Sequence, residues 1–237
     1  MDCPHLFHAN STPNTFIQYC VSDRGNISQL QTPFGHFQLG AQGEGYGFCQ
    51  QDPAPGTVYF DYPSGDSGNW KLPQVLSVNG SAIKIPRTTT DGTWTLVQTL
   101  SKVAATGSIN VVMALTNNQA ADKVAYLVRF ADVDPDGQQF SPFAGSSFQS
   151  AFAWDVRNNS FRLGLQVENV GHWNGFQQGY IQRIPNPPNP CAFAFNSDTG
   201  GYLNGFIESK DVSLVYAYVG NVPAHKTVTV TLSYSGT

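Results

Sequence analysis

Apolar and polar residues alternate along most of the chain with a period of two. The alternation is clear in residues 94–100, 109–116 and 161–168. It is clearest near the C-terminus, where apolar side chains are separated by hydroxyl side chains: Val228, Val230, Leu232 and Tyr234 against Thr227, Thr229, Thr231 and Ser233. Successive side chains of a strand point to opposite faces, so this period indicates half-buried strands. Helical spacing is nearly absent, and we expect an all-β protein.

Turn-forming dipeptides separate the predicted strands. Asn79-Gly80 lies between two apolar runs, and Asp91-Gly92 precedes the strand that begins near Trp94. Both dipeptides accept the positive φ angles of tight hairpins. We expect roughly fourteen short strands at the spacing usual in hairpin-rich folds. The sequence therefore predicts an antiparallel β-sandwich or supersandwich.

The length fits one domain, because all-β sandwiches commonly reach about 200–250 residues as single units. We therefore expect a single β-sandwich domain over residues 1–237. Residues 141–150 are predicted to form a loop, which is a candidate internal junction between two halves. Residues 185–190, PNPPNP, cannot form a central strand because proline lacks the ladder donor. We expect a surface segment there that ends at Cys191.

Composition narrows the classes of partner. Charged residues make up 12% of the chain, against about 25% in a typical domain, and the net charge is -4. No run of Lys or Arg could neutralise phosphates, which argues against nucleic acid. No apolar stretch approaches the roughly 20 residues of a membrane-spanning helix. A surface rich in Ser, Thr, Asn, Gln and Gly is typical of extracellular proteins that face carbohydrate, so we expect a secreted protein.

The four cysteines form an even set without a CxxC pair. Two disulfides in an oxidising compartment are the simplest interpretation. Three pairings are compatible with the sequence, and we favour Cys3 with Cys20 and Cys49 with Cys191, because the first pair would hold the N-terminus. The alternative is four buried free thiols in a cytosolic protein.

A DxDxDG run at Asp132, Asp134, Asp136 and Gly137 is the clearest candidate metal site. Carboxylates at alternate positions converge on one cation when the chain curls, which is why calcium loops use this spacing. An EF-hand needs a Glu at loop position 12, where Phe143 stands. We therefore expect a β-sandwich calcium loop completed by carbonyls or distant residues. The alternative is an acidic hairpin turn.

A loop rich in aromatic and amide residues is the candidate carbohydrate site. It contains His172, Trp173, Asn174, Phe176 and Tyr180 among several glycines. An aromatic face can stack on the C–H face of a sugar while neighbouring amides bond its hydroxyls. The alternative is that the aromatic residues of this loop close one end of the sandwich.

Glu44 lies between glycines in residues 43–49 and is a candidate general acid or base. His172 is its candidate catalytic partner, and His36 is another. The alternative is that Glu44 caps a turn or pairs with an arginine such as Arg87. For Arg87 and Arg129, ion pairs across strands are the ordinary explanation. Signatures of α/β serine hydrolases, zincins and nucleotide-binding loops are absent from the sequence.

Several motifs follow one another in a recognisable order: GEGYxxC, IPRTTTDGTWTLVQTL, INVVMALTNNQ and RFADVDPDG. Over most of residues 24–234 this succession resembles a group of bacterial exported β-sandwich proteins. The RxTxDG segment that begins at Arg87, followed by a long alternating strand, is also similar to the galactose-mutarotase-like supersandwich of sugar-processing enzymes. The resemblance implies the fold. It implies no activity, because the catalytic histidine and acidic residues of that family do not map onto this chain.

Three functions remain open. The first is an extracellular carbohydrate-binding or adhesion module stabilised by calcium. The second is a sugar-processing enzyme of the supersandwich type. The third is a self-assembling subunit of an extracellular filament or shell, since low charge and Thr-rich strands favour edge contacts between copies. The sequence alone does not decide whether the protein is an enzyme.

Overall fold

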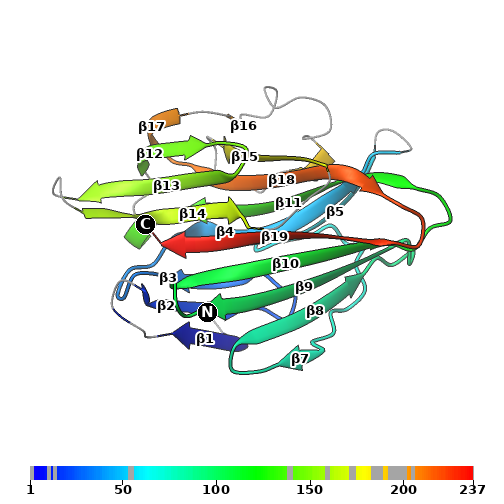
Figure 1. Cartoon of the computed structure of the whole chain (residues 1–237), viewed down its shortest axis with the longest axis horizontal. Helices are drawn as coiled ribbons and strands as arrows, with labels where there is room; N and C mark the ends of the chain where they lie inside the picture. Colours follow the sequence, from blue (N-terminus) through cyan, green and yellow to red (C-terminus); the bar gives the residue numbers. More distant parts are fainter. Residues whose placement is uncertain are drawn as a thin grey trace.

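The computed structural model describes residues 3–9, 12, 15–52, 56–137, 141–157, 161–170, 175–182, 189–191, 202–203 and 206–236. Within these residues the chain forms nineteen strands, and the short 3₁₀ turn η2 (Pro135–Gly137) follows β11. The strands form three antiparallel sheets (Figure 1). The predicted all-β antiparallel sandwich is confirmed, with nineteen strands instead of the expected fourteen, three of which (β6, β7 and β16) are only two residues long.

The largest sheet has nine strands. Their spatial order is β17 (Phe206–Lys210), β12 (Ser141–Ser146), β13 (Ser150–Arg157), β14 (Phe161–Asn169), β19 (Thr227–Gly236), β10 (Ser108–Asn117), β9 (Trp94–Val103), β8 (Ala82–Thr88) and β7 (Ser77–Val78). The segment expected as a loop near residues 141–150 is instead β12 and its turn into β13, two strands that pair as a hairpin. The single-domain organisation stays a prediction.

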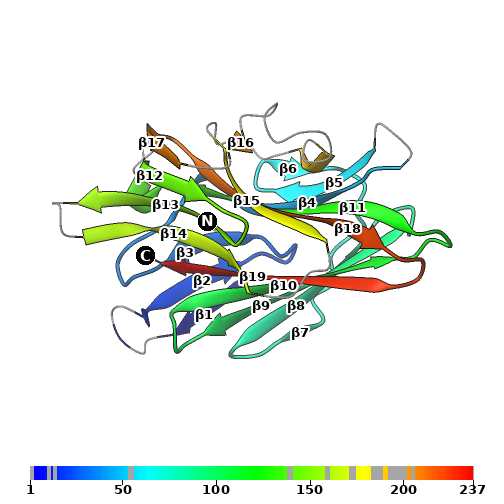
Figure 2. The same cartoon turned by 45° about the horizontal axis from the view of Figure 1, so that its top comes forward.

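The second sheet has seven strands, and the third has three. The order of the second is β16 (Tyr202–Leu203), β15 (Phe176–Gln182), β18 (Ser213–Val222), β11 (Lys123–Val133), β4 (Leu39–Gln50), β5 (Thr57–Tyr62) and β6 (Gly65–Asp66). The third contains β1 (His5–Ala9), β2 (Ile17–Val21) and β3 (Ile27–Gln31). Figure 2 shows the seven-stranded sheet lying over the nine-stranded one, with β1–β3 beside them.

The predicted apolar faces form the core between the two larger sheets. Phe48 of β4 meets Trp94 of β9 across the sandwich, with ring centroids 5.4 Å apart. The nine-stranded sheet contributes the residues that the alternation predicts to be buried: Leu96, Leu100, Ile109, Val111, Met113, Leu115, Val230 and Leu232. Apolar burial of this kind is the main stabilising contribution to the fold.

The seven-stranded sheet is buried on both faces. In β11, Leu127 and Ala131 face the main core, whereas Val128 and Phe130 pack in a second apolar cluster with Tyr180 on the other face, which we call the outer face. A strand covered on both sides needs no polar alternation. This explains why residues 124–131 carry almost no period-two signal.

Two disulfides join Cys3 to Cys20 and Cys49 to Cys191, with Cα–Cα distances of 5.6 and 5.0 Å. The favoured pairing is therefore confirmed. The second disulfide fastens the short segment at Pro190 to the outer face of the seven-stranded sheet. Residues 185–188 of the proline-rich stretch lie outside the described residues.

The edge strand β7 and the segment that precedes it expose apolar side chains. Leu72 is 90% exposed, Leu76 59% and Val78 50%. Exposed apolar edges can pair with another chain. Self-association nevertheless stays a prediction. No helix in the described part of the chain is long and apolar enough to cross a membrane.

Candidate functional site

A buried ion pair lies between the two larger sheets. Arg129 of β11 donates through Nε to Glu44 Oε1 and through Nη2 to Glu44 Oε2, the latter at 2.9 Å. Glu44 also accepts hydrogen bonds from the Ile27 backbone N–H at 2.7 Å and from the Tyr234 hydroxyl at 3.1 Å. Glu44 and Arg129 are each 1% exposed. Burial raises the pKa of the Glu44 carboxyl, while the guanidinium and the two hydrogen bonds limit the rise.

Strand register creates this pair. Residue Ala131 lies opposite Glu44, and Arg129 lies opposite Tyr46, so Glu44 and Arg129 are diagonal neighbours on one face. The guanidinium also donates to the Gln98 side-chain oxygen. The charged group is therefore enclosed by partners from both sheets, and the predicted cross-strand ion pairing of Arg129 is confirmed.

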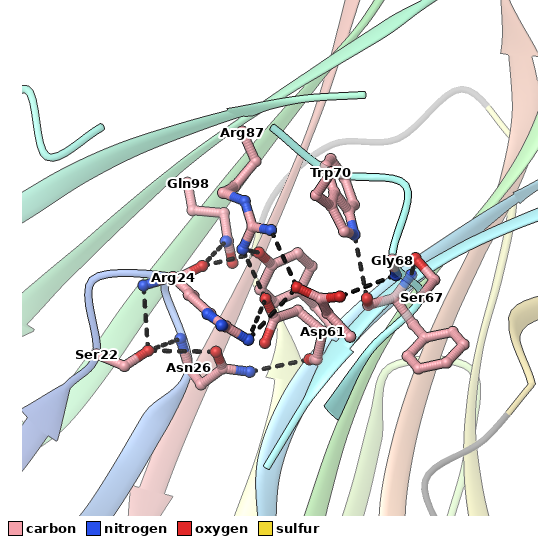
Figure 3. Close-up of polar contacts among 12 residues, drawn as sticks. Ser22, Arg24, Asn26, Asp61, Ser67, Gly68, Trp70, Arg87 and Gln98 are labelled. Carbon is pink, nitrogen blue, oxygen red and sulfur yellow. Dashed lines mark hydrogen bonds and ion pairs between the residues drawn. The ribbon is translucent and has the colours of Figure 1, made fainter. Parts of the chain in front are cut away.

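A second charged cluster reaches the surface (Figure 3). Arg87 of β8 contacts Asp61 of β5 at 2.6 Å, and both side chains are 2% exposed. Arg87 also lies 3.7 Å from Asp66 and 5.1 Å from the centre of the Trp70 ring. Arg24, which is half exposed, lies 3.4 Å from Asp66 and 3.9 Å from Asp61. We call Arg24, Asp61, Asp66, Trp70 and Arg87 the arginine cluster.

The turn between β2 and β3 carries Arg24 to this position. Asn26 donates its side-chain N–H to the Asp61 carbonyl at 2.9 Å, and its backbone N–H bonds the Ser22 hydroxyl at 3.1 Å. The Tyr46 hydroxyl donates to the Arg24 carbonyl at 2.7 Å. Burial raises the pKa of Asp61, while Arg87 opposes the rise. Arg87 thus pairs with Asp61, and its predicted ion pairing is confirmed.

A third group of carboxylates lies on the outer face of the seven-stranded sheet. Asp132 is the second-last residue of β11, Asp134 directly follows that strand, and Asp211 lies two residues before β18; one oxygen of each lies within 4.8 Å of the others. Asp132 pairs with Ser213 in the register, which brings Asp211, two residues earlier, to the same side. We call Asp132, Asp134 and Asp211 the acidic cluster.

Asp132 and Asp134 are buried, Asp211 is partly buried, and the described residues offer the acidic cluster few hydrogen-bond donors. Asp132 accepts the Gln42 backbone N–H at 2.9 Å and lies 3.5 Å from the Ser213 hydroxyl. Within the described residues, the buried Oδ1 atoms of Asp134 and Asp211 have no hydrogen-bond partner. Burial raises the pKa of Asp132 to about 6 and that of Asp134 to about 7, and neighbouring carboxylates add to both rises.

Glycine at position 40 leaves the space in front of these carboxylates. A Cβ built on Gly40 would overlap the Oδ2 atoms of both Asp132 and Asp134. Both carboxylates therefore face the same stretch of β4 backbone. Oxygen-rich, acidic surroundings of this kind can hold a hard divalent cation.

The predicted metal ligands are only partly brought together. Asp132 and Asp134 converge, but the structure does not bring Asp136 to them. Its carboxylate lies 2.9 Å from the His36 ring and accepts the Phe37 backbone N–H at 3.0 Å. The reason is that β11 keeps Asp132 and Asp134 on one side of an extended chain, whereas η2 turns Asp136 away with φ of 53°. Asp211, which no local motif signals, takes the third position.

The predicted carbohydrate site stays a prediction, because only part of it lies in the described residues. His172, Trp173 and Asn174 lie outside the described residues. Phe176 is 51% exposed and meets the edge of Phe148, itself 61% exposed, with ring centroids 6.2 Å apart. Tyr180 lies four residues after Phe176 in β15, so both side chains point to the outer face of the sheet, but Tyr180 is 7% exposed and packs in the outer-face cluster whereas Phe176 reaches solvent.

The predicted catalytic pair stays a prediction, because His172 lies outside the described residues. Glu44 is enclosed by its hydrogen bonds and by Arg129. The other candidate partner, His36, contacts Asp136. Sequence reasoning missed the arginine cluster as a unit, since Asp61 and Arg87 belong to different sheets and no local pattern joins them.

These features define an antiparallel β-sandwich with charge-paired arginines and carboxylates in its interior and, on its outer face, an acidic cluster that has no basic partner among the described residues. No protein-family model matches the sequence, and no curated protein matches it.

Solved structures share the fold at low identity. A bacterial glucoamylase complexed with acarbose has a TM-score of 0.61 at 9% identity, covering 99% of this chain and 32% of the glucoamylase. The chain thus spans about a third of that protein. A GalM/aldose epimerase homologue from C. elegans has a TM-score of 0.55 at 6% identity, covering 98% of both chains. A polysaccharide lyase has a TM-score of 0.53 at 11% identity, over 93% of this chain and 32% of its own. At such identities the likeness shows the fold alone.

Proposed function

We propose that the protein is an extracellular carbohydrate-binding or adhesion module, stabilised by a calcium ion. The glucoamylase, the aldose epimerase homologue and the polysaccharide lyase that share its fold all carry the names of carbohydrate-active proteins. Fold likeness alone does not assign a function. It supports the proposal together with the surface features of this chain and with two disulfides, which suit an oxidising compartment.

The observation that carries the proposal is the solvent-facing aromatic pair of Phe148 and Phe176. Two large aromatic side chains that are both more than half exposed, at 61% and 51%, are suited to stack on sugar rings. The exposed Gln149 follows Phe148 and provides an amide donor and acceptor beside the rings. Phe176 also belongs to the predicted aromatic loop from His172 to Tyr180, so the two candidate surfaces share this residue.

The backbone beneath this aromatic pair is already fixed. The Tyr216 hydroxyl donates to the Phe148 carbonyl, and Gly179 donates its N–H to the Ser147 carbonyl at 2.9 Å. Ser147 closes the turn by donating its N–H to the Ser150 carbonyl at 2.7 Å. A preformed surface loses little conformational entropy when it binds a ligand. A neutral glycan also suits a chain with only 12% charged residues.

A glycan array followed by calorimetry on soluble oligosaccharides tests the proposal. Phe176→Ala and Phe148→Ala should each weaken binding about tenfold, the usual effect of removing an aromatic anchor. Phe34→Ala is the matched control, because Phe34 is also exposed, at 67%, but packs on Phe16. It should leave the affinity unchanged. Unchanged binding in the Phe148/Phe176 double variant would refute this site.

A sugar-processing enzyme is the second candidate, and the arginine cluster favours it. Asp61 is a buried carboxyl whose pKa is raised by burial, and the cluster opens to solvent at Arg24 and Asp66. Perturbed carboxyls beside arginines are common in catalytic sites. Turnover of free sugars or polysaccharides that Asp66→Asn abolishes without loss of stability would support this candidate. Loss of turnover in Glu44→Gln would instead support the predicted pair of Glu44 and His172.

A further inference from the structure

We infer that Asp132, Asp134 and Asp211 form a divalent-cation site that takes calcium. The inference specifies the ligands of the cation in the proposed function, and it does not depend on carbohydrate binding. The site differs from a continuous DxDxDG loop. It joins the end of β11 to Asp211, two residues before β18, and it faces β4 at Gly40.

The first step concerns charge. Every other fully buried carboxylate described above has a basic partner: Glu44 contacts Arg129, and Asp61 contacts Arg87. In the described part of the chain, the ion pairs of the structure include none with Asp132, Asp134 or Asp211. Among the described residues, the charged groups that act on Asp134 are the two other carboxylates of the cluster. Buried like charges destabilise the fold unless a proton or a cation neutralises them.

The second step concerns unused oxygen atoms. Asp134 is 7% exposed, and its buried Oδ1 has no hydrogen-bond partner among the described residues. The buried Oδ1 atom of Asp211 also has no hydrogen-bond partner among the described residues. Buried acceptors without a donor are rare in folded proteins and call for an explanation, of which a bound ion is one. Two such atoms in one cluster indicate a bound cation that several oxygen atoms coordinate at once.

The third step concerns space. The Oδ2 atoms of Asp132 and Asp134 both approach the Gly40 backbone where any side chain would overlap them. The φ angle of Gly40 is not in the left-handed region. Backbone strain therefore does not require glycine at this position. Glycine is needed there because a side chain at position 40 would overlap the two carboxylates.

The ligand chemistry favours calcium. All three ligand atoms are carboxylate oxygens, without nitrogen or sulfur, which selects hard cations over zinc or copper. Calcium accepts irregular sets of six to eight oxygens, about half of which can be waters or carbonyls, whereas magnesium demands near-octahedral geometry. We therefore expect magnesium to bind more weakly than calcium.

Calcium titration of the full chain tests the inference. The protein is stripped with EDTA, dialysed, and titrated with CaCl₂ or MgCl₂ in a calorimeter, with thermal melts in parallel. We expect one saturable calcium site in the range of extracellular modules, Kd about 0.1–1 mM, and a melting temperature that rises with calcium concentration. Absence of saturable binding up to about ten times that range would overturn the inference.

Two pairs of variants assign the ligands. Asp211→Asn should weaken calcium binding at least tenfold, while Asp136→Asn should bind like the wild type. Gly40→Ala should also abolish binding, because it fills the space without changing any charge. Gly80→Ala, at an open position, is its control. Melting in EDTA verifies that each variant folds. Wild-type affinity in Asp211→Asn, or equal losses in Asp136→Asn and Asp211→Asn, would overturn the assignment.

The two proposals fail separately. Loss of glycan binding in Phe176→Ala with intact calcium binding supports two independent sites. If the wild type binds glycan equally well in EDTA and calcium but shows no calcium isotherm, this inference fails and carbohydrate binding stands. If it binds calcium through Asp211 but no glycan, the proposed function fails and the cation site stands.

Discussion

Buried carboxylates occur in two regions of the molecule with opposite surroundings. Between the two large sheets, Glu44 and Asp61 each contact a buried arginine. On the outer face of the seven-stranded sheet, Asp132 and Asp134 face a third carboxylate instead. All four are at least nine-tenths buried. The comparison indicates that burial alone does not assign a role to an acidic residue; the charge of its neighbours does.

One strand supplies both environments. In β11, Arg129 and Asp132 are three residues apart, so they point to opposite faces of the sheet. The inner face brings Arg129 to Glu44 of the adjacent strand, and the outer face brings Asp132 towards Asp211. We therefore expect substitutions in the two regions to change the free energy of unfolding in opposite directions.

The largest effect is expected for Arg129→Met. It leaves Glu44 buried without a counter-charge, and the loss of one partner from a buried pair costs about 3–5 kcal/mol. Urea unfolding followed by fluorescence measures the change. The double variant Arg129→Met with Glu44→Gln is the control and should recover much of the loss. A loss below about 1 kcal/mol in the single variant would contradict a structural role for the pair.

Asp61→Asn should destabilise the protein by about 2–3 kcal/mol, because Arg87 then keeps only the more distant Asp66 as a counter-charge. Arg24→Ala is the matched comparison at the exposed end of the same cluster. It should cost less than about 1 kcal/mol, since a half-exposed arginine is screened by water. Equal losses in the two variants would mean that the stabilising contribution of the cluster does not decrease from its buried end to its exposed end.

Sequence pattern sufficed for the fold and for part of these contacts. Period-two alternation predicts β9, β10 and β19, because each has one face in the core and one towards solvent. Arg129 could be expected to pair across strands, but its partner could not be named. That choice depends on the register of β4 against β11, which no local motif encodes.

The acidic cluster shows the same limit. The DxDxDG run indicates a concentration of carboxylates, and two of its members converge. Asp211 is distant in sequence and is brought in by the pairing of β11 with β18. Asp136 is removed by the turn at Pro135–Gly137. Long-range strand pairing and one local turn therefore decide which carboxylates converge. Neither can be predicted from local sequence patterns.

The acidic cluster should make stability depend on pH when divalent cations are absent. The folded-state pKa is about 6 for Asp132 and about 7 for Asp134, whereas an unfolded Asp has a pKa of about 3.9. The folded state then binds more protons than the unfolded state between about pH 4 and pH 7, so its stability falls as pH rises through this window. In EDTA we expect a loss of about 1 kcal/mol per pH unit between pH 6 and 7, measured by urea unfolding. A stability that is flat or rising there would contradict the uncompensated character of the cluster.

The smallest effect, and the sharpest contrast with Asp61→Asn, is expected for Asp134→Asn in EDTA at pH 8. There the wild type holds ionised carboxylates close together, and the substitution removes one charge while its amide can donate to Asp132 or Asp211. We expect a gain of about 1 kcal/mol in unfolding free energy, although most single substitutions destabilise. The same variant should flatten the pH dependence and lose the response to calcium. The matched substitution Asp61→Asn under the same buffer should lower stability. If both substitutions lower it equally, the acidic cluster has a neutralising partner of its own, and the distinction between the two regions fails.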